Sequence, residues 1–500
     1  MSTLLDLVSQ CQATGQHHPW PRVAVDATTW QFVAEQLAAG RWSLLGLWGG
    51  NAAVHAAVLD SDAIAVLSYD CKDGGFPSLS RHHAPALRLE RAIRDLFGLE
   101  PRGIEDPRPW LDHGRWGSGA PLLDNSGARA RGRPYRFLPA EGESLHEIPV
   151  GPVHAGIIEP GHFRFNANGE TIVRLEARLG YVHKGIERLM VGCDLGHAAI
   201  LAGRCSGDST VAYALAFARA AEAALGIDAP ARAHWLRALM AELERLANHL
   251  GDIGAICNDA AFALMHTHCG ILRERVLRAA DACFGHRLMR DQVVPGGVVA
   301  DIDDRGEHTI RALLVEIRRR FPSLVELYDN TASLQDRTVG TGVLKHELAQ
   351  QYAAGGYVGR ASGRSFDARR TPGYPPYGDL EFATPVLHEG DVNARVWIRI
   401  REVEQSLTIV EQVLGRLPSG AIRTDLPRRG GEGMALIEGF RGDILAWVSL
   451  AQDATVLRCH LRDPSWFQWP LLEAAIEGNI VADFPLCNKS FNCSYSGHDL

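Results

Sequence analysis

Apolar residues recur along this chain with two different patterns, and the change of pattern divides it. Between residues 44 and 70, short continuous apolar runs such as Ile64-Ala65-Val66-Leu67 predict β-strands. Residues 86–98 carry the spacing of a helix. Residues 1–111 are therefore predicted to form a small α/β module.

Helical spacing dominates the later part of the chain. Within residues 234–250, apolar side chains recur at the three- and four-residue steps that place them on one helix face. Residues 310–321 and 396–414 repeat this pattern, and Pro322 is expected to end the first of the two. Residues 147–500 are predicted to be a mainly helical domain that begins with a small β-rich segment near 151–178. The chain as a whole is expected to be an α+β protein.

Residues 112–146 separate these two parts. They are rich in Gly, Pro, Ser and charged residues, which is the composition of a linker.

Composition and charge exclude some classes of function but do not identify one. The 500 residues are 46% apolar, enough for several buried cores, and the net charge of −8 gives no general reason to expect a nucleic-acid partner. No apolar run reaches 18 residues and no signal segment begins the sequence. We expect a cytoplasmic chain that meets the inner face of the cell membrane only through partners. Its ten cysteines form no C-x-x-C pair and are expected to be reduced core thiols.

The segment with the clearest chemistry is 203–210, Gly-Arg-Cys-Ser-Gly-Asp-Ser-Thr. It resembles a loop of nickel–iron hydrogenase large subunits in which an Arg precedes a Cys-Gly-x-Cys pair whose thiolates hold the metal. Here the two cysteine positions are Ser206 and Ser209. Serine hydroxyls stay protonated near neutral pH and are hard, weak ligands for nickel, whereas thiolates are soft.

Further motifs occur in the same order as in that family. They cover essentially the whole chain and comprise Phe76–Leu79, Glu90–Gly98, Gly151–Phe165, Leu179–Glu187, Arg245–His249, Pro295–Val298, Ser362–Arg370 and Glu402–Leu407. The first two resemble the C-type subunit of respiratory complex I. The others resemble its D-type, quinone-site subunit and the large subunits of hydrogenase-4 and formate-hydrogenlyase-type membrane hydrogenases. The resemblance implies a fusion of a complex I C-like module with a D-like domain.

A second thiolate pair is lost near the end of the sequence. In the family it lies in Asp-Pro-Cys-x-x-Cys, and that frame corresponds here to Asn492–Gly497, with Ser494 and Gly497 at the cysteine positions. A nickel–iron centre is therefore expected to be absent. An alternative set of Cys205, Cys487 and Cys493 lacks paired spacing. The sequence ends at Leu500 without the tail that a maturation protease would remove, which fits the loss of metal insertion.

The resemblance to complex I suggests a second use for the emptied site. There a His and a Tyr bind the quinone headgroup, and an Asp pairs with the His. These positions fall on Ile158, Gly207 and Asp259, while an earlier His of the same loop corresponds to His154. The candidates for a pocket that binds a quinone or another small carrier without a covalent bond are His154, His162, Ser206, Ser209, Asp259, Arg364 and Asp367. A His–Asp pair would orient the imidazole for proton delivery.

The remaining candidates have structural alternatives. Asp208 is a candidate pocket acid, and Ser209 is placed to cap a helix over 211–225, as Asp259 is for a helix from 260 onward. Arg364 and Asp367 lie in a loop punctuated by Gly and Pro, where Arg can clamp a carboxylate of a partner protein.

Three functions remain open at this point. The first is a nickel-free subunit of a membrane-associated oxidoreductase complex that handles a quinone or another carrier. The second is a nickel–iron hydrogenase with altered ligands. The third is a non-catalytic scaffold between a soluble arm and ion-translocating membrane subunits. The chain has no cluster-binding cysteine run, so the resemblance implies a small iron–sulfur subunit beside residues 151–260, together with integral membrane subunits.

Overall fold

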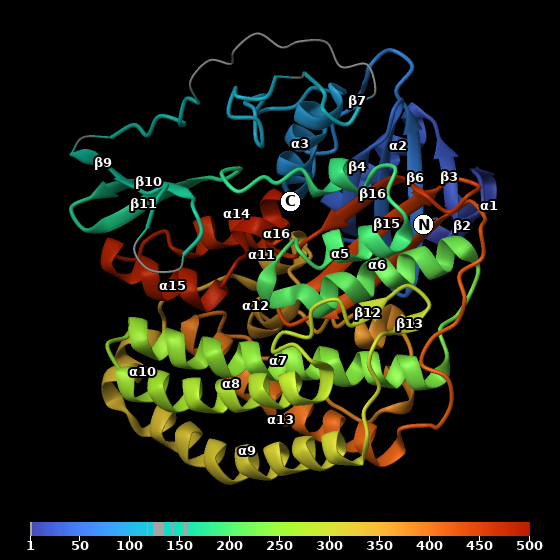
Figure 1. Cartoon of the computed structure of the whole chain (residues 1–500). Coiled ribbons are helices and arrows are strands. Elements are labelled where there is room, and N and C mark those ends of the chain that lie inside the picture. The colour runs from blue at the N-terminus through green and yellow to red at the C-terminus, as the bar shows by residue number, and fades with distance from the viewer. Residues whose placement is uncertain (1–2, 118, 124–134, 143, 155–157) are drawn as a thin grey trace.

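The computed structural model describes residues 3–117, 119–123, 135–142, 144–154 and 158–500 (Figure 1). Residues 118, 124–134 and 143 of the expected linker, and residues 155–157 of the expected quinone-site loop, lie outside the described part. Helices and strands are mixed along the chain, which confirms the α+β class.

The first module is built on a five-stranded sheet of order β1-β3-β6-β5-β4. Its strands are β1 (Gln12–Ala13), β3 (Arg22–Val25), β4 (Ser43–Gly49), β5 (Ala53–Asp60) and β6 (Ala63–Asp70). Helices α1 (Leu4–Gln10), α2 (Ala27–Ala38) and α3 (Leu87–Phe97) and the strand pair β7 (Gly75–Pro77) and β8 (Glu100–Arg102) accompany it. The strands predicted within 44–70 and the helix predicted over 86–98 are confirmed.

A second sheet, of order β16-β15-β14-β2, was not expected from the sequence. It consists of β2 (His17–His18), β14 (Gly431–Gly439), β15 (Gly442–Leu450) and β16 (Val456–Arg462). The two sheets pack face to face, with Ala57 and Leu59 of β5 in one cluster with Leu436 and Trp447. Alternate residues of β5, such as Val58, enter a different core. Burial on both faces explains why these strands have continuous apolar runs.

Helices cover the other side of the second sheet (Figure 1). α6 (Thr210–Leu225) packs on β14 and β15, and the bundle beyond it contains α7 (Ala231–Asp259), α8 (Ala263–Phe284), α9 (Asp304–Asn330) and α13 (Val392–Arg416). The three helices predicted from spacing are confirmed. The expected end at Pro322 is wrong, because α9 continues to Asn330. Buried Tyr328 carries the packed face beyond the proline, so tertiary packing outweighs the local preference.

The expected β-rich segment is a three-stranded sheet of β9 (Leu145–Val150), β10 (His162–Asn168) and β11 (Thr171–Arg178). The remaining elements are α4 (Ile186–Met190), α5 (Leu195–Ala202), β12 (Val293–Val294), β13 (Gly297–Val298), α10 (Ala332–Thr338), α11 (His346–Gln351), α12 (Gly356–Ala361), α14 (Ser465–Ala475), α15 (Phe484–Phe491) and α16 (Tyr495–Asp499). Among the described residues, none of these helices is long and apolar enough to cross a membrane.

The two parts of the chain are joined by more than the connecting segment. β2 runs parallel to β14, with His17 opposite Glu432. One hydrophobic core includes Trp30 and Val54 of the first module together with Trp469 and Phe491 near the C-terminus. The domain limits at residues 111 and 147 stay a prediction, but the core that stabilises the first module is shared.

Candidate functional site

The four positions that correspond to metal-binding cysteines meet in space. Ser206 precedes the 3₁₀ turn Gly207–Ser209 that leads into α6, and Ser494 is the N-cap of α16. Although 288 residues separate them, their hydroxyl oxygens lie 2.9 Å apart. The backbone N–H of Gly497 donates to the Ser494 hydroxyl at 2.9 Å. The two segments that the resemblance paired therefore form one site.

An ion pair occupies the same site. Arg441, at the turn between β14 and β15, donates to Asp208 Oδ1 at 2.8 Å and to Ser209 Oγ at 3.2 Å. A second guanidinium nitrogen donates to Asp208 Oδ2. Burial opposes ionisation of Asp208, but Arg441 outweighs this effect and holds the pKa of the carboxyl below its usual value. We call Ser206, Asp208, Ser209, Arg441 and Ser494 the polar cluster.

The surroundings of the polar cluster are closely packed and hydrogen-bonded. Tyr213 donates its hydroxyl to Asp463 at 2.7 Å, and Ser494 N–H donates to the Ser465 hydroxyl at 2.8 Å. A Cβ added at Gly497 would lie 2.4 Å from Asp463 Oδ2. A side chain of any size at position 497 therefore requires Asp463 to move.

The donor set of the polar cluster does not fit a nickel–iron centre. It offers hydroxyls, one carboxylate and a guanidinium in place of four soft thiolates. No group of three or more His, Cys, Asp or Glu residues within the described ranges is placed to hold a metal. Burial also raises the pKa of Cys205, Cys487 and Cys493, which disfavours the thiolate form that binds metals.

A cavity of about 210 Å³ opens beside Asp208, between α7 and α8. Glu244 lies at its wall and accepts hydrogen bonds from the N–H groups of Val211 and Ala212, at 2.7 and 3.1 Å. Burial raises the pKa of Glu244 to about 8. Asn248 donates to the backbone oxygen of Asp208 at 2.7 Å. This cavity carries two carboxyl groups whose pKa values are shifted in opposite directions.

The position of Ser209 was predicted correctly, but the cap was not. Ser209 is the N-cap residue of α6, yet its side chain makes no capping hydrogen bond. Glu244 satisfies the first N–H groups of the helix from α7 instead, and the Ser209 hydroxyl lies beside Arg441. A local sequence pattern could not reveal a cap supplied 33 residues away.

Two other candidates of the expected quinone pocket, His154 and His162, lie close to each other in the connection between β9 and β10. His154 Nε2 lies 2.7 Å from the carbonyl of Gly161, and His162 Nδ1 lies 3.2 Å from the carbonyl of Gly151. Both bonds stay within the β9–β10 connection. Ile158 is 42% exposed.

Asp259 occupies a different position from the one expected. It is the last residue of α7, and α8 begins only at Ala263, so Asp259 does not cap the next helix. Burial raises the pKa of Asp259, while nearby Lys489 and His266 oppose this shift. No contact among the described residues joins Asp259 to His154 or His162.

Arg364 and Asp367 lie in the interior, which corrects the expectation that they face a partner. Arg364 donates to the carbonyl of Ala354 at 3.0 Å and is 6% exposed. Asp367 is 1% exposed and accepts from Arg369 at 2.7 Å. Burial opposes its ionisation, but Arg369 holds the pKa of Asp367 below its usual value. Their partners come from the same chain, and Asp367 belongs to an internal ion-pair network with Arg360 and Arg369.

Residues 259–429 match the protein family described as respiratory-chain NADH dehydrogenase, 49 Kd subunit. Over 444 residues the chain is 30% identical to formate hydrogenlyase subunit 5 of Escherichia coli (strain K12), which covers 86% of this chain and 78% of that protein. Over 355 residues it is 31% identical to the D-type subunit of the NADH-quinone oxidoreductase of Syntrophobacter fumaroxidans, which covers 70% of this chain and 95% of that protein.

A solved structure is similar as well. A chain of the membrane-bound sulfane sulfur reductase, an archaeal respiratory membrane complex, has a TM-score of 0.68 and 26% sequence identity, and the match covers 72% of this chain and 99% of that chain. Sequence and fold agree on the relationship that the ordered motifs indicated. This chain belongs to the family of hydrogenase-4-type and complex I-type large subunits.

Proposed function

We infer that this chain is a nickel-free large subunit of a membrane-bound oxidoreductase complex related to formate-hydrogenlyase-type hydrogenases and complex I. The observation that carries this proposal is the hydrogen bond between Ser206 and Ser494. It joins the two segments that correspond to the metal-binding segments of the hydrogenases that this chain resembles. The hydroxyls bond to each other and to their neighbours rather than presenting four soft donors to a metal.

The charges of the polar cluster support the same proposal. Arg441 is 4% exposed at its side chain and already forms two hydrogen bonds to Asp208. A fixed guanidinium at this place repels a divalent cation and neutralises the carboxylate that would attract one. In this protein an internal ion pair takes the place of the metal.

The proposed complex supplies what the chain lacks. Electrons come from a small iron–sulfur subunit, and integral membrane subunits hold this chain at the inner face of the cell membrane, on its cytoplasmic side. A quinone or another small carrier, bound without a covalent bond, is the proposed partner in electron transfer. The family's quinone ligands do not fit, since Ile158 and Gly207 stand at the His and Tyr positions. The cavity beside Asp208 and Glu244 is the proposed alternative.

Elemental analysis of the complex with its co-purifying partners tests whether this chain binds nickel. We expect iron from the partner's clusters and no stoichiometric nickel. Restoring cysteine at 206, 209, 494 and 497 is expected to leave hydrogen uptake undetectable, because Asp463 obstructs a side chain at 497 and Arg441 remains. Stoichiometric nickel in the natural complex would overturn the proposal.

The scaffold function is the second candidate, favoured by the hydrogen bonds that fill the polar cluster. Titration of the assembled complex with a soluble quinone separates the two functions. Quinone-dependent turnover supports a carrier site, whereas an assembled complex without turnover supports the scaffold.

Asp259→Asn tests the role that the resemblance assigns to this residue. If Asp259 helps to deliver protons, the variant will assemble normally and transfer electrons more slowly. Wild-type turnover in a fully assembled variant would remove Asp259 from the carrier site.

A further inference from the structure

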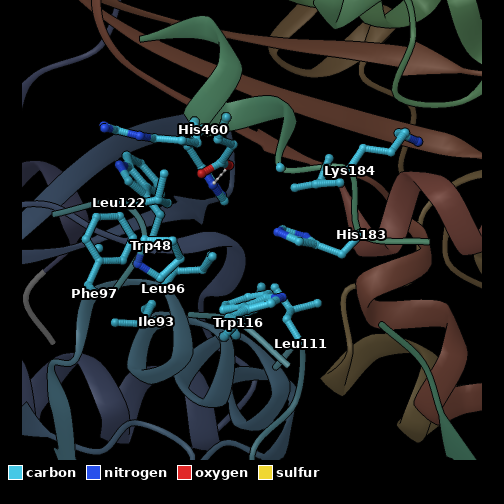
Figure 2. A pocket seen from close by; sticks show the side chains of 18 of the residues that line it. Trp48, Ile93, Leu96, Phe97, Leu111, Trp116, Leu122, His183, Lys184 and His460 are labelled. Atoms are coloured by element: carbon cyan, nitrogen blue, oxygen red, sulfur yellow. Dashed lines mark hydrogen bonds and ion pairs between the residues drawn. The ribbon is translucent and has the colours of Figure 1, made fainter. Parts of the chain in front are cut away.

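A second cavity lies where the first module meets the large-subunit domain. It measures about 280 Å³ and lies between α3 and β4 on one side and residues 183–189 and β16 on the other. Figure 2 shows Trp48, Ile93, Phe97, Trp116 and Leu122 around it. We call this space the aromatic cavity. Most of its lining residues are apolar, which favours an apolar ligand.

Several polar groups at the wall are already engaged. Glu187 lies 2.9 Å from His460 Nδ1, and the His460 ring stacks on Trp48 with ring centres 5.2 Å apart. The ammonium group of Lys184 donates to the carbonyl of Cys205 at 3.0 Å. These contacts hold Glu187, His460 and Lys184 in place at the wall of the aromatic cavity.

His183 provides the directional group. Its ring points into the aromatic cavity beside Trp116, with ring centres 4.9 Å apart (Figure 2). Nδ1 lies 2.7 Å from the backbone oxygen of Asp499. A carbonyl oxygen can only accept, so Nδ1 carries the proton. In the neutral ring Nε2 is then an acceptor, and no hydrogen bond to it from another described residue is present.

We propose that the aromatic cavity binds an apolar ring compound that carries a hydroxyl group, and that this hydroxyl donates to His183 Nε2. The aromatic walls match the ring, and the fixed tautomer of His183 selects a donor over an acceptor. No member of the polar cluster lines the aromatic cavity, so the proposal holds whether or not that cluster binds a metal.

Two probes of similar ring and opposite hydrogen-bonding ability test this site. At pH 8, 1-naphthol should bind the full chain about tenfold more tightly than 1-methoxynaphthalene, the effect of one hydrogen bond. Calorimetry gives both affinities, and quenching of tryptophan fluorescence follows binding near Trp48 and Trp116. Equal affinities of the two probes would overturn the selection by His183.

A cavity-filling variant locates the binding. Ala92 of α3 lines the aromatic cavity, and Ala92→Leu should weaken both probes while leaving the fold intact. His183→Phe should abolish the preference for 1-naphthol and retain the weaker binding of the ring. Unchanged affinities in Ala92→Leu, or no binding of either probe to the natural chain, would refute the proposal.

Discussion

The polar cluster and the aromatic cavity are both junctions between distant parts of the chain, but they are filled differently. In the polar cluster, Ser206 meets Ser494 and Arg441 meets Asp208, so side chains of this protein satisfy one another. In the aromatic cavity, Trp48 and Trp116 contribute large rigid rings, and a space of about 280 Å³ remains. Complementary polar groups can draw together and fill a junction, whereas bulky apolar groups leave room for a ligand.

The polar cluster and the aromatic cavity therefore differ in how easily each can accept a ligand. A buried hydrogen-bonded ion pair resists opening, because separating it leaves each partner without compensation. An apolar cavity needs no such rearrangement to accept a ligand. The polar cluster is therefore expected to contribute to stability, and the open space beside it and the aromatic cavity to binding.

The largest expected effect concerns Glu244, at the edge of the polar cluster. Its pKa is raised from 4.5 to about 8 by burial, so the folded state binds a proton that the unfolded state releases. The contribution of the Glu244 proton to the free energy of unfolding is fully present below pH 4.5 and is lost as the pH rises to about 8. We expect a loss of roughly 4 kcal/mol over this range.

Glu244→Gln isolates this contribution. The amide keeps the shape of the side chain but has no carboxyl proton, so the free energy of unfolding should fall less steeply between pH 5 and pH 8 than in the natural chain. Denaturant unfolding at several pH values measures the slope. Parallel curves for the two proteins would mean that Glu244 is ionised in the folded state throughout this range.

The next effect compares two Arg–Asp pairs of similar geometry. Arg441→Met removes the cationic partner of Asp208 and should lower the free energy of unfolding by about 3 kcal/mol. This value is at the low end for buried pairs because the Asp208 side chain is 37% exposed. Arg204 and Asp291, with hydrogen bonds of 2.9 and 2.8 Å, form the comparison pair, in which the Arg side chain is 35% exposed instead of 4%. Arg204→Met should cost less than about 1 kcal/mol.

Denaturant unfolding of both variants gives the difference. Adding Asp208→Asn to Arg441→Met should recover part of the loss, since the unpaired charge is then removed. Equal costs for Arg441→Met and Arg204→Met would show that the polar cluster behaves like solvent-exposed surface.

The sequence predicted the helices better than the site. Long apolar stripes identified α7, α9 and α13, because a helix face can be read from its own residues. The β14–β16 sheet was missed, since strands buried on both faces lack the alternation that distinguishes a strand from a buried helix. The three serine positions, Ser206, Ser209 and Ser494, were located through the ordered motifs of the family.

The pairing of Arg441 with Asp208 and Ser209 could not be predicted in the same way. Arg441 lies 233 residues from Asp208, and no local pattern connects a turn between two strands to a loop before α6. The sequence cue is Arg441, which stands with Glu438 and Asp443 between two apolar runs. Such a residue must find a counter-charge when the strands are buried, but the sequence does not say which one.

The smallest expected effect is that of Gly497→Ala, which tests how closely the polar cluster is packed. Gly497→Ala places a Cβ 2.4 Å from Asp463 Oδ2 and 2.9 Å from Ser494 Oγ, so the carboxylate that accepts the Tyr213 hydrogen bond must move. Overpacking of this kind costs about 1–2 kcal/mol. Gly207→Ala is the control, because a Cβ there meets nothing within 4 Å. Thermal unfolding should separate the midpoints of the two variants by about 1–2 °C if the cluster is closed. If Gly497→Ala is as stable as Gly207→Ala, the polar cluster can open at little cost, and the contrast with the aromatic cavity disappears.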